Sequence, residues 1–234
     1  MATHPYLAMT AAEFAAARPL PEKIAWMACH FSPYGTGLSN LPPALPEGSL
    51  LILNDRIPIC DHDSIRIADQ LAQTANVLNC SGILLDFQKP EDPALCDLAA
   101  HLIDSLSCPV AVSEEYAHGC DCPVFLSPCP HHTPLQEHIE AWNGRELWLD
   151  LAVDAETITL TKKGAVILPL PLGETSENGH WDKGLHCHYS IESGADFARF
   201  TLWRTREDLE ALAQEAERLG IHTLVGLYQE LKSE

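Results

Sequence analysis

The chain is poor in basic residues, in aromatic residues and in long apolar runs. It has 14 lysines and arginines against 33 aspartates and glutamates, a formal net charge of −19, and only 7% aromatic residues. A surface with this excess of negative charge repels phosphate backbones and anionic membranes, so we expect neither nucleic acid nor a membrane as a partner. No apolar run approaches the roughly 20 residues of a bilayer-spanning helix. These features predict a globular, acidic protein.

Sequence motifs of several enzyme classes are also missing. The chain has no G-x-S-x-G turn, no Walker A sequence and no G-x-G-x-x-G after its first predicted strand, so we expect neither a nucleotide site nor a cofactor. The N-terminus lacks the basic region and apolar stretch of a secretory signal. The nine cysteines are odd in number and have no framework spacing. We therefore expect reduced thiols in a cytoplasmic protein.

Apolar runs and helical periodicity alternate along the chain, which is typical of an α/β protein. Helices are predicted over 64–78, 93–106, 135–142 and 206–219. Strands are predicted over 24–29, 50–53, 83–85, 109–112, 123–126, 147–151 and 223–227. This order favours a compact (β/α)8 barrel of the TIM type, with some helices reduced to loops. A doubly wound open sheet is the alternative.

Two segments depart from this alternation. Residues 1–22 are expected to form an N-terminal lead-in with a short helix, which starts at a capping box, Thr10 to Glu13, and stops before Pro21. The remainder, 23–234, is expected to be a single barrel domain. Predicted strands over 157–160 and 166–168 flank a Lys-Lys-Gly turn, which indicates a β-hairpin inserted in the barrel. The polar stretch 173–184 is expected to be a loop.

The segment Ser81–Gln88 combines a buried strand with a polar end. Three apolar residues, Ile83 to Leu85, are followed by a carboxylate, an aromatic ring and a carboxamide. Alternation along a strand places Leu84, Asp86 and Gln88 on one face. Because sites in parallel barrels lie at the C-terminal ends of the strands, we expect this strand to present Asp86 and Gln88 to a ligand.

The same segment resembles the signature of family 18 glycoside hydrolases, the chitinase-like enzymes, written D-G-x-D-x-D-x-E. Gly82, Asp86 and Phe87 match it, while its first Asp, its middle Asp and its catalytic Glu are replaced by Ser81, Leu84 and Gln88. The resemblance implies a ligand containing N-acetylglucosamine, whose own acetamido oxygen attacks the anomeric carbon. It implies that Asp86 orients that group and that Gln88 occupies the position of the proton donor. The family carries the signature on its fourth strand, whereas the predicted strands place it on the third.

The replacement by Gln88 leaves two functions open, a glycoside hydrolase with a different acid and a non-catalytic carbohydrate-binding pseudoenzyme. A carboxamide has no proton to give near neutral pH, and losing a positioned general acid typically costs roughly 10²–10⁴-fold in rate. Glu114 is the candidate replacement acid, because it follows the next strand directly, where it could also be solvated. The ligand, an oligosaccharide or another small molecule, is expected to meet side chains at other strand ends, namely His30, Asn54, Asp55, Glu115, Tyr189 and Tyr228. The two tyrosines could equally belong to the core.

Clusters of cysteine and histidine give a third hypothesis, a metal-dependent hydrolase. The residues concerned are Cys120, Cys122, Cys129, His186 and His188, all of types that bind zinc. The two histidines would share one face of a predicted strand. The C-x-C spacing is less common in zinc sites than C-x₂₋₄-C, and no zinc-ribbon pattern surrounds it. We therefore expect no metal in the site.

Overall fold

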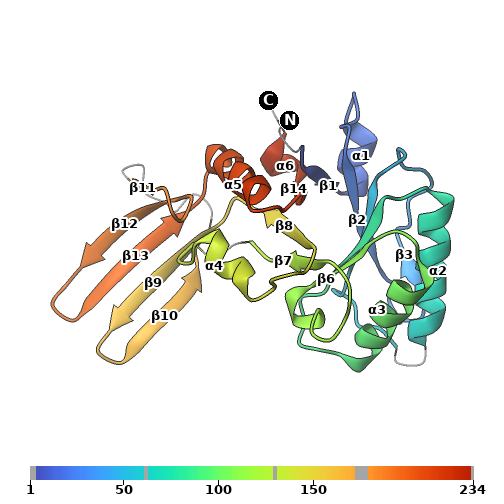
Figure 1. Ribbon diagram of the computed structural model, residues 1–234, viewed down its shortest axis with the longest axis horizontal. Coiled ribbons are helices and arrows are strands. Elements are labelled where there is room, and N and C mark those ends of the chain that lie inside the picture. Colours follow the sequence, from blue (N-terminus) through green and yellow to red (C-terminus); the bar gives the residue numbers. More distant parts are fainter. Residues whose placement is uncertain (1–3, 61–62, 129–130, 172–178, 233–234) are drawn as a thin grey trace.

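The computed structural model describes residues 4–60, 63–128, 131–171 and 179–232, which form a closed barrel with a projecting sheet (Figure 1). Eight parallel strands make the barrel: β1 (Tyr6–Met9), β2 (Ile24–Phe31), β4 (Leu50–Asn54), β5 (Gly82–Asp86), β6 (Val110–Ser113), β7 (Val124–Leu126), β8 (Leu147–Leu151) and β14 (Thr223–Leu227). They follow one another around the ring in sequence order, and β1 pairs with both β2 and β14. The predicted (β/α)8 class is confirmed, because these pairings close the ring.

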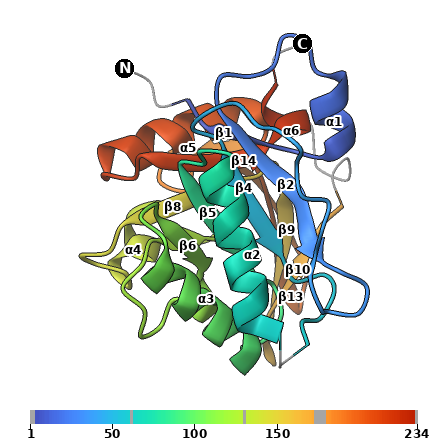
Figure 2. The same cartoon turned by 90° about the vertical axis from the view of Figure 1, so that its right-hand side faces the viewer.

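Helices cover the outside of this barrel unevenly. The long helices α2 (Ser64–Val77) and α3 (Pro93–Ser105) lie side by side over β4, β5 and β6 (Figure 2), and α5 (Arg206–Arg218) packs against β8. The other helices are short: α1 (Ala11–Ala16), α4 (Leu135–Glu140) and α6 (Tyr228–Leu231). Between β2 and β4 the chain forms a two-residue strand, β3 (Leu38–Ser39), in place of a helix. The predicted reduction of some helices is therefore found.

The barrel begins earlier in the chain than the sequence pattern indicates. Residues 1–22, expected as a lead-in, contain β1, which pairs Leu7 with Gly226 on one side and Ala8 with Ala25 on the other. β1 lies between Pro5 and the capping box that starts at Thr10, so its four residues read as part of the lead-in to the short helix. The sequence therefore predicted seven strands of the barrel, and the structure has eight. With β1 included, β5 is the fourth strand of the barrel, which is the position of the family 18 signature.

Apolar side chains fill the N-terminal part of the barrel interior. Trp148 is 2% exposed and belongs to an inner cluster that also contains Leu50, Leu84 and Phe125. Its ring passes close to the backbone of β5: a Cβ added at Gly82 would lie 2.9 Å from the Trp148 Cη2 atom. Glycine at this position therefore makes room for the indole, and the ring closes this end of the barrel.

A five-stranded antiparallel sheet projects from the barrel between β8 and α5 (Figure 1). Its strands, in spatial order, are β10 (Gly164–Pro169), β9 (Ala155–Thr161), β13 (Phe197–Trp203), β12 (Cys187–Ser193) and β11 (His180–Asp182). We call this sheet the wing. The predicted hairpin is confirmed as β9 and β10, and the wing is larger because β11, β12 and β13 extend it. Of the predicted loop 173–184, residues 173–178 lie outside the described residues, and part of the rest forms β11.

Two expectations about the chain as a whole concern its helices and its thiols. None of the described helices combines the length and the apolar character that a bilayer crossing requires. Every cysteine within the described ranges is a free thiol. Cys129 lies outside those ranges.

Candidate functional site

A cavity of about 560 Å³ opens at the C-terminal end of the barrel. Its volume falls within the range of roughly 300–1,000 Å³ that is typical of small-molecule sites. Leu84, Phe125 and Val225 of the inner cluster supply apolar lining. The polar lining consists of Thr10, His30, Asn40, Asn54, Arg56, Asp86, Gln88 and Asp150. Both carboxyl and amide groups are thus presented to whatever enters.

Three polar side chains of the cavity come from adjacent positions on neighbouring strands. The strand register pairs His30 of β2 with Asn54 of β4, and Asn54 with Asp86 of β5. Residues paired across a sheet point to the same face, so all three side chains face the interior of the barrel. The parallel register thereby brings together three residues that were predicted for the site.

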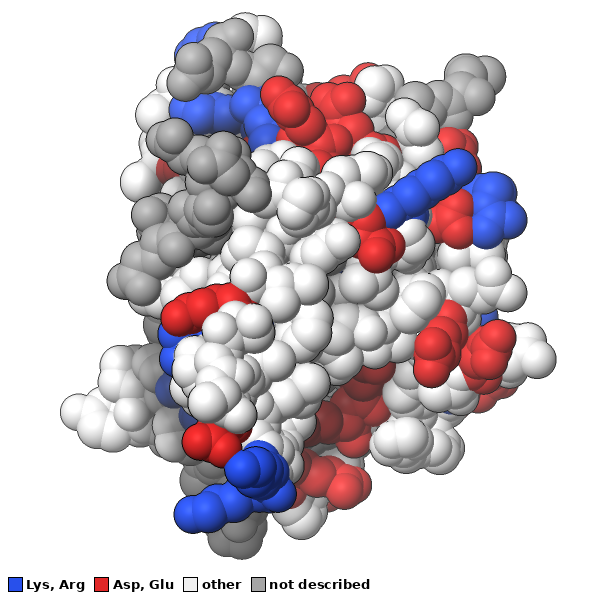
Figure 3. Space-filling view, turned by 90° about the vertical axis from the view of Figure 1, so that its left-hand side faces the viewer, with Lys and Arg blue, Asp and Glu red and all other residues white. Residues whose placement is uncertain are grey.

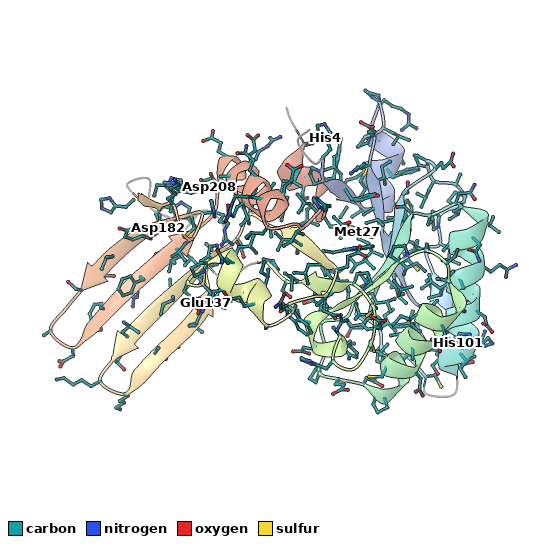
Figure 4. The ribbon with its side chains drawn as sticks, in the orientation of Figure 1. His4, Met27, His101, Glu137, Asp182 and Asp208 are labelled. Atoms are coloured by element: carbon teal, nitrogen blue, oxygen red, sulfur yellow. The ribbon has the colours of Figure 1, made fainter. Side chains whose placement is uncertain are left out.

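β2 contains a bulge in this part of the wall. Trp26 pairs with Leu51, but Cys29 pairs with Leu53, so Met27 and Ala28 together oppose a single residue of β4. Both Met27 and Ala28 line the cavity. Met27 is labelled in Figure 4, where it lies on β2. An apolar methionine therefore lies in the same wall as the polar row.

Hydrogen bonds fix the histidine and the asparagine of that row. The His30 Nδ1 atom lies 2.6 Å from the Phe31 carbonyl oxygen, and its Nε2 atom lies 3.0 Å from the Asn40 Nδ2 atom. Since a carbonyl only accepts, Nδ1 carries the proton and Nε2 accepts from Asn40. Asn54 donates from Nδ2 to the Cys29 carbonyl oxygen at 3.1 Å. The cavity wall is thus organised before any ligand arrives.

Asp86 and Gln88 are in direct contact at the end of β5. The Gln88 Nε2 atom donates to the Asp86 Oδ1 atom at 2.5 Å. Burial raises the pKa of Asp86, and the hydrogen bond from Gln88 and the charge of Arg56 only partly offset this. The carboxamide therefore holds the carboxylate in place and has no proton of its own to transfer.

Asp55 binds the backbone that follows β5 through its carboxylate. Its side chain is 3% exposed and accepts from the backbone nitrogens of Gln88 at 3.1 Å and of Lys89 at 2.9 Å. On the other side, the Ser113 hydroxyl donates to the Phe87 carbonyl oxygen at 2.8 Å. Asp55 was expected to contact the ligand, but it is occupied with the backbone that follows β5. Its carboxylate thereby fixes the backbone at Gln88 and Lys89.

Glu114 is not found where a replacement acid would have to be. Its carboxylate accepts from the Ser127 backbone nitrogen and from the Trp142 indole, each at 3.2 Å, and lies 3.2 Å from the His138 Nε2 atom. Burial alone would raise the pKa of Glu114, but the contacts with His138, Ser127 and Trp142 lower it overall. These partners, two of them contributed by α4 and the turn after it, hold an ionised group away from the cavity lining.

Three other expected contacts also lie outside the cavity lining. Glu115 is exposed in the turn after β6. Tyr189 belongs to β12 of the wing, where its ring packs 5.6 Å from that of His180. Tyr228 begins α6, and the Lys232 ammonium group lies over its ring. The sequence pattern could not separate wing strands from barrel strands, which explains the placement of Tyr189.

The metal hypothesis gains no support from the part of the chain that the structure describes. Within it, no group of three or more His, Cys, Asp or Glu residues could hold a metal ion. His186 precedes β12 with a φ of 50°, so it does not share a strand face with His188. The His188 Nδ1 atom instead lies 2.9 Å from a carboxylate oxygen of Asp208, at the start of α5 beside the wing (Figure 4).

The cavity contains one carboxyl group that the sequence analysis did not select, that of Asp150. It lies on β8, one step of the strand alternation beyond Trp148, and lines the cavity with Asp86. Burial and the charges of Asp86, Glu230 and Asp154 raise its pKa to about 8. The signal was present in the sequence, because residues 147–150, like residues 83–86, are three apolar residues followed by an aspartate.

The chain is similar in fold to several solved structures, although its sequence identity to them is low. No protein-family model and no curated protein matches the chain. Among solved structures, a mutant class V chitinase from Nicotiana tobaccum in complex with NAG4 aligns over 98% of this chain and 94% of its own, with a TM-score of 0.60 and 10% identity. The fold is that of chitinase-like barrels. The resemblance drawn from residues 81–88 is confirmed at the level of the fold.

Two bacterial proteins give the same result. A chitinase from Chromobacterium violaceum aligns over 91% of this chain and 88% of its own, with a TM-score of 0.56 and 9% identity. The spore cortex-lytic enzyme SleL from Bacillus cereus aligns over 98% of this chain and 71% of its own, with a TM-score of 0.54 and 10% identity. At such identities the likeness concerns the arrangement of the backbone, and residue roles have to be argued from this chain.

Proposed function

We propose that the protein is glycoside hydrolase-like and that it binds an oligosaccharide containing N-acetylglucosamine at the barrel mouth. The observation that carries the proposal is the Asp86 carboxylate, which faces the cavity from the fourth barrel strand with Gln88 hydrogen-bonded to it at 2.5 Å. The likeness in fold to chitinases supports the class of ligand.

The chemistry of the lining suits an N-acetyl sugar. The amide N–H of an acetamido group is a donor, and Asp86 offers a carboxylate oxygen as acceptor. Gln88 and Asn54 can donate to hydroxyl or carbonyl oxygens from positions that are already fixed by hydrogen bonds. Met27 and Leu84 supply apolar surface for a methyl group and for the carbon face of a sugar ring. Preorganised donors and acceptors reduce the entropic cost of binding.

The test is calorimetric titration with chitotetraose, the β-1,4-linked tetramer of N-acetylglucosamine, and with cellotetraose, which lacks the acetamido groups. We expect the parent protein to bind chitotetraose at least about tenfold more tightly, because a hydrogen bond to a charged group contributes about 1.5–3 kcal/mol. Asp86→Ala should lose that preference. Glu115→Gln, an exposed substitution outside the lining, is the control and should retain it. Equal affinity for both sugars, or no binding of either, would contradict the proposal.

A further inference from the structure

A cleavage reaction at this mouth needs a proton donor that Gln88 cannot be. Glu114 is held by Ser127, Trp142 and His138, and Asp55 is occupied with the backbone of Gln88 and Lys89. Among the described residues that line the cavity, the carboxyl groups are those of Asp86 and Asp150. Since Asp86 already accepts a hydrogen bond from Gln88, Asp150 is the remaining acid within the cavity.

Asp150 reaches the cavity through the geometry of β8. Trp148 and Asp150 alternate onto the inner face of that strand, with the Trp148 ring packed against Gly82 at the N-terminal end of the barrel. Asp150 lies nearer the mouth, three strands around the ring from Asp86. The two carboxyl groups therefore approach the same space from different sides, as the two functional carboxyls of glycosidases do.

Burial raises the pKa of both carboxyl groups, but the groups that surround them differ. Burial raises the pKa of Asp150 to about 8, with further contributions from Asp86 on β5, Glu230 on α6 and Asp154 after β8, while the Leu151 N–H lowers it. For Asp86 the burial effect is partly offset by Gln88 and Arg56. Gln88 and Arg56 thus favour the charged form of Asp86, and that charge favours the protonated form of Asp150. A pair divided in this way is the arrangement required of an acid and its anionic partner.

We propose that Asp150 is the catalytic acid of this site and donates the proton that the missing glutamate would supply, so that the protein hydrolyses β-linked N-acetylglucosaminides. This inference rests on the proposed binding function. Beyond binding, it assigns hydrolysis to the site, names Asp150 as the acid and predicts how the rate depends on pH.

The reaction then balances with water as the only co-reactant. In the first step the acetamido carbonyl oxygen, oriented by Asp86, forms a bond to the anomeric carbon while the bond from that carbon to the leaving oxygen breaks. The Asp150 proton passes to the leaving oxygen, and Asp150 becomes a carboxylate. In the second step this carboxylate removes a proton from water, the water oxygen attacks the anomeric carbon, and the bond to the acetamido oxygen breaks. Asp150 is protonated again at the end.

The experiment compares the parent with Asp150→Asn on two substrates. On chitotetraose, whose leaving group is a sugar alkoxide, the variant should be slower by roughly 10²–10⁴-fold in kcat, as for other lost general acids. On the 4-nitrophenyl glycoside of chitobiose, whose leaving group departs without a proton, the loss should be much smaller. Chitotetraose affinity, measured by calorimetry, should change less than about threefold. Asp97→Asn, an exposed substitution on α3, is the matched control and should retain parental rates.

The pH profile of the parent is a second readout that needs no variant. Its kcat on chitotetraose should fall as pH rises through about 8, while that on the nitrophenyl glycoside should fall less. A parent that binds chitotetraose but releases no product overturns the role of Asp150 and leaves the binding function standing. Equal losses on both substrates, or an Asp150→Asn variant as fast as the parent, also overturn it. A parent that binds no chitotetraose removes both proposals.

Discussion

The barrel and the wing use β-strands in opposite ways. Barrel strands are buried on both faces, because an inner cluster fills the ring and helices cover much of its outside. Central barrel strands such as β4 and β5 consequently read as continuous apolar runs. Wing strands are antiparallel, and much of their surface remains exposed. Among the described residues, those that line the cavity belong to the barrel strands and to the segments that join them, and none belongs to the wing.

One face of the wing carries an apolar row that no layer of the described structure covers. The register aligns Ile167 with Ile158, Ile158 with Phe200, and Phe200 with Ile191 across four strands. Ile167 is 47% exposed and Ile191 is 57% exposed. Figure 3, which views the molecule from the left-hand side of Figure 1, shows few charged side chains over its centre. The wing thus differs from the barrel in two ways: its strands are antiparallel, and the apolar side chains on one of its faces are not covered by another layer of the described structure.

The largest expected difference between the two regions comes from removing a tryptophan in each. Trp148→Ala should lower the free energy of unfolding by about 3–5 kcal/mol, because the ring is buried in the barrel and its loss leaves a cavity. Trp181→Ala, on β11 of the wing, should cost less than about 1 kcal/mol, because that ring is 42% exposed. Urea unfolding followed by circular dichroism measures both. Similar costs would mean that the wing packs as tightly as the barrel.

A carboxyl group in each region gives the next contrast, this time in pH dependence. The folded protein holds the Asp150 proton more tightly than the unfolded chain, so its stabilising contribution is lost as pH rises from about 4 to about 8. A shift of this size corresponds to at most about 6 kcal/mol, and exposure to the open mouth reduces this figure, so we expect roughly 2–3 kcal/mol. Asp150→Asn should remove this decline between pH 5 and pH 9 in urea titrations. Glu192→Gln, exposed on the wing, should leave it unchanged. An Asp150→Asn curve parallel to that of the parent would contradict the raised pKa.

The smallest expected effect is on the apolar row itself. Ile191→Thr should change the free energy of unfolding by no more than about 0.5 kcal/mol, because threonine retains the branched side chain that suits a strand and the site is exposed. It should also reduce the binding of a hydrophobic dye to the folded protein. Ile52→Thr, at a position that is 5% exposed in the barrel, is the matched comparison and should cost about 1–3 kcal/mol. A large loss at Ile191 would show that the row is covered.

Elements with clear local signals could be predicted from the sequence. The helix predicted over 206–219 is found as α5, whose capping box joins Thr205 to Asp208, and the strand predicted over 147–151 is found with those bounds. β1 was not predicted because it lies directly before the capping box of α1, and its pairing with β14 depends on a distant part of the chain. Local propensity carries no information about such a partner.

Some features of the candidate site could also be predicted from the sequence, and others depend on the fold. Asp86 and Gln88 share a face because a strand alternates with a period of two, so their orientation was predictable. His30 and Asn54 were expected as strand ends, and the register brings them into one row with Asp86. Asp150 was readable as a strand-end aspartate, but its proximity to Asp86 follows only from closure of the ring. Its raised pKa is a property of that closed interior, which a linear sequence does not display.

Closure between the first and last barrel strands also has a consequence for folding. β1 and β14 are neighbours in the ring, although the other barrel strands and the whole wing lie between them in the sequence. Until β14 has paired, β1 and β8 each expose an unpaired strand edge, and the apolar row of the wing is exposed as well. Long-range pairing of this kind is slow and leaves such surfaces open to wrong partners. Pairing of β14 with β1 and β8 is therefore the step that covers both strand edges and closes the ring.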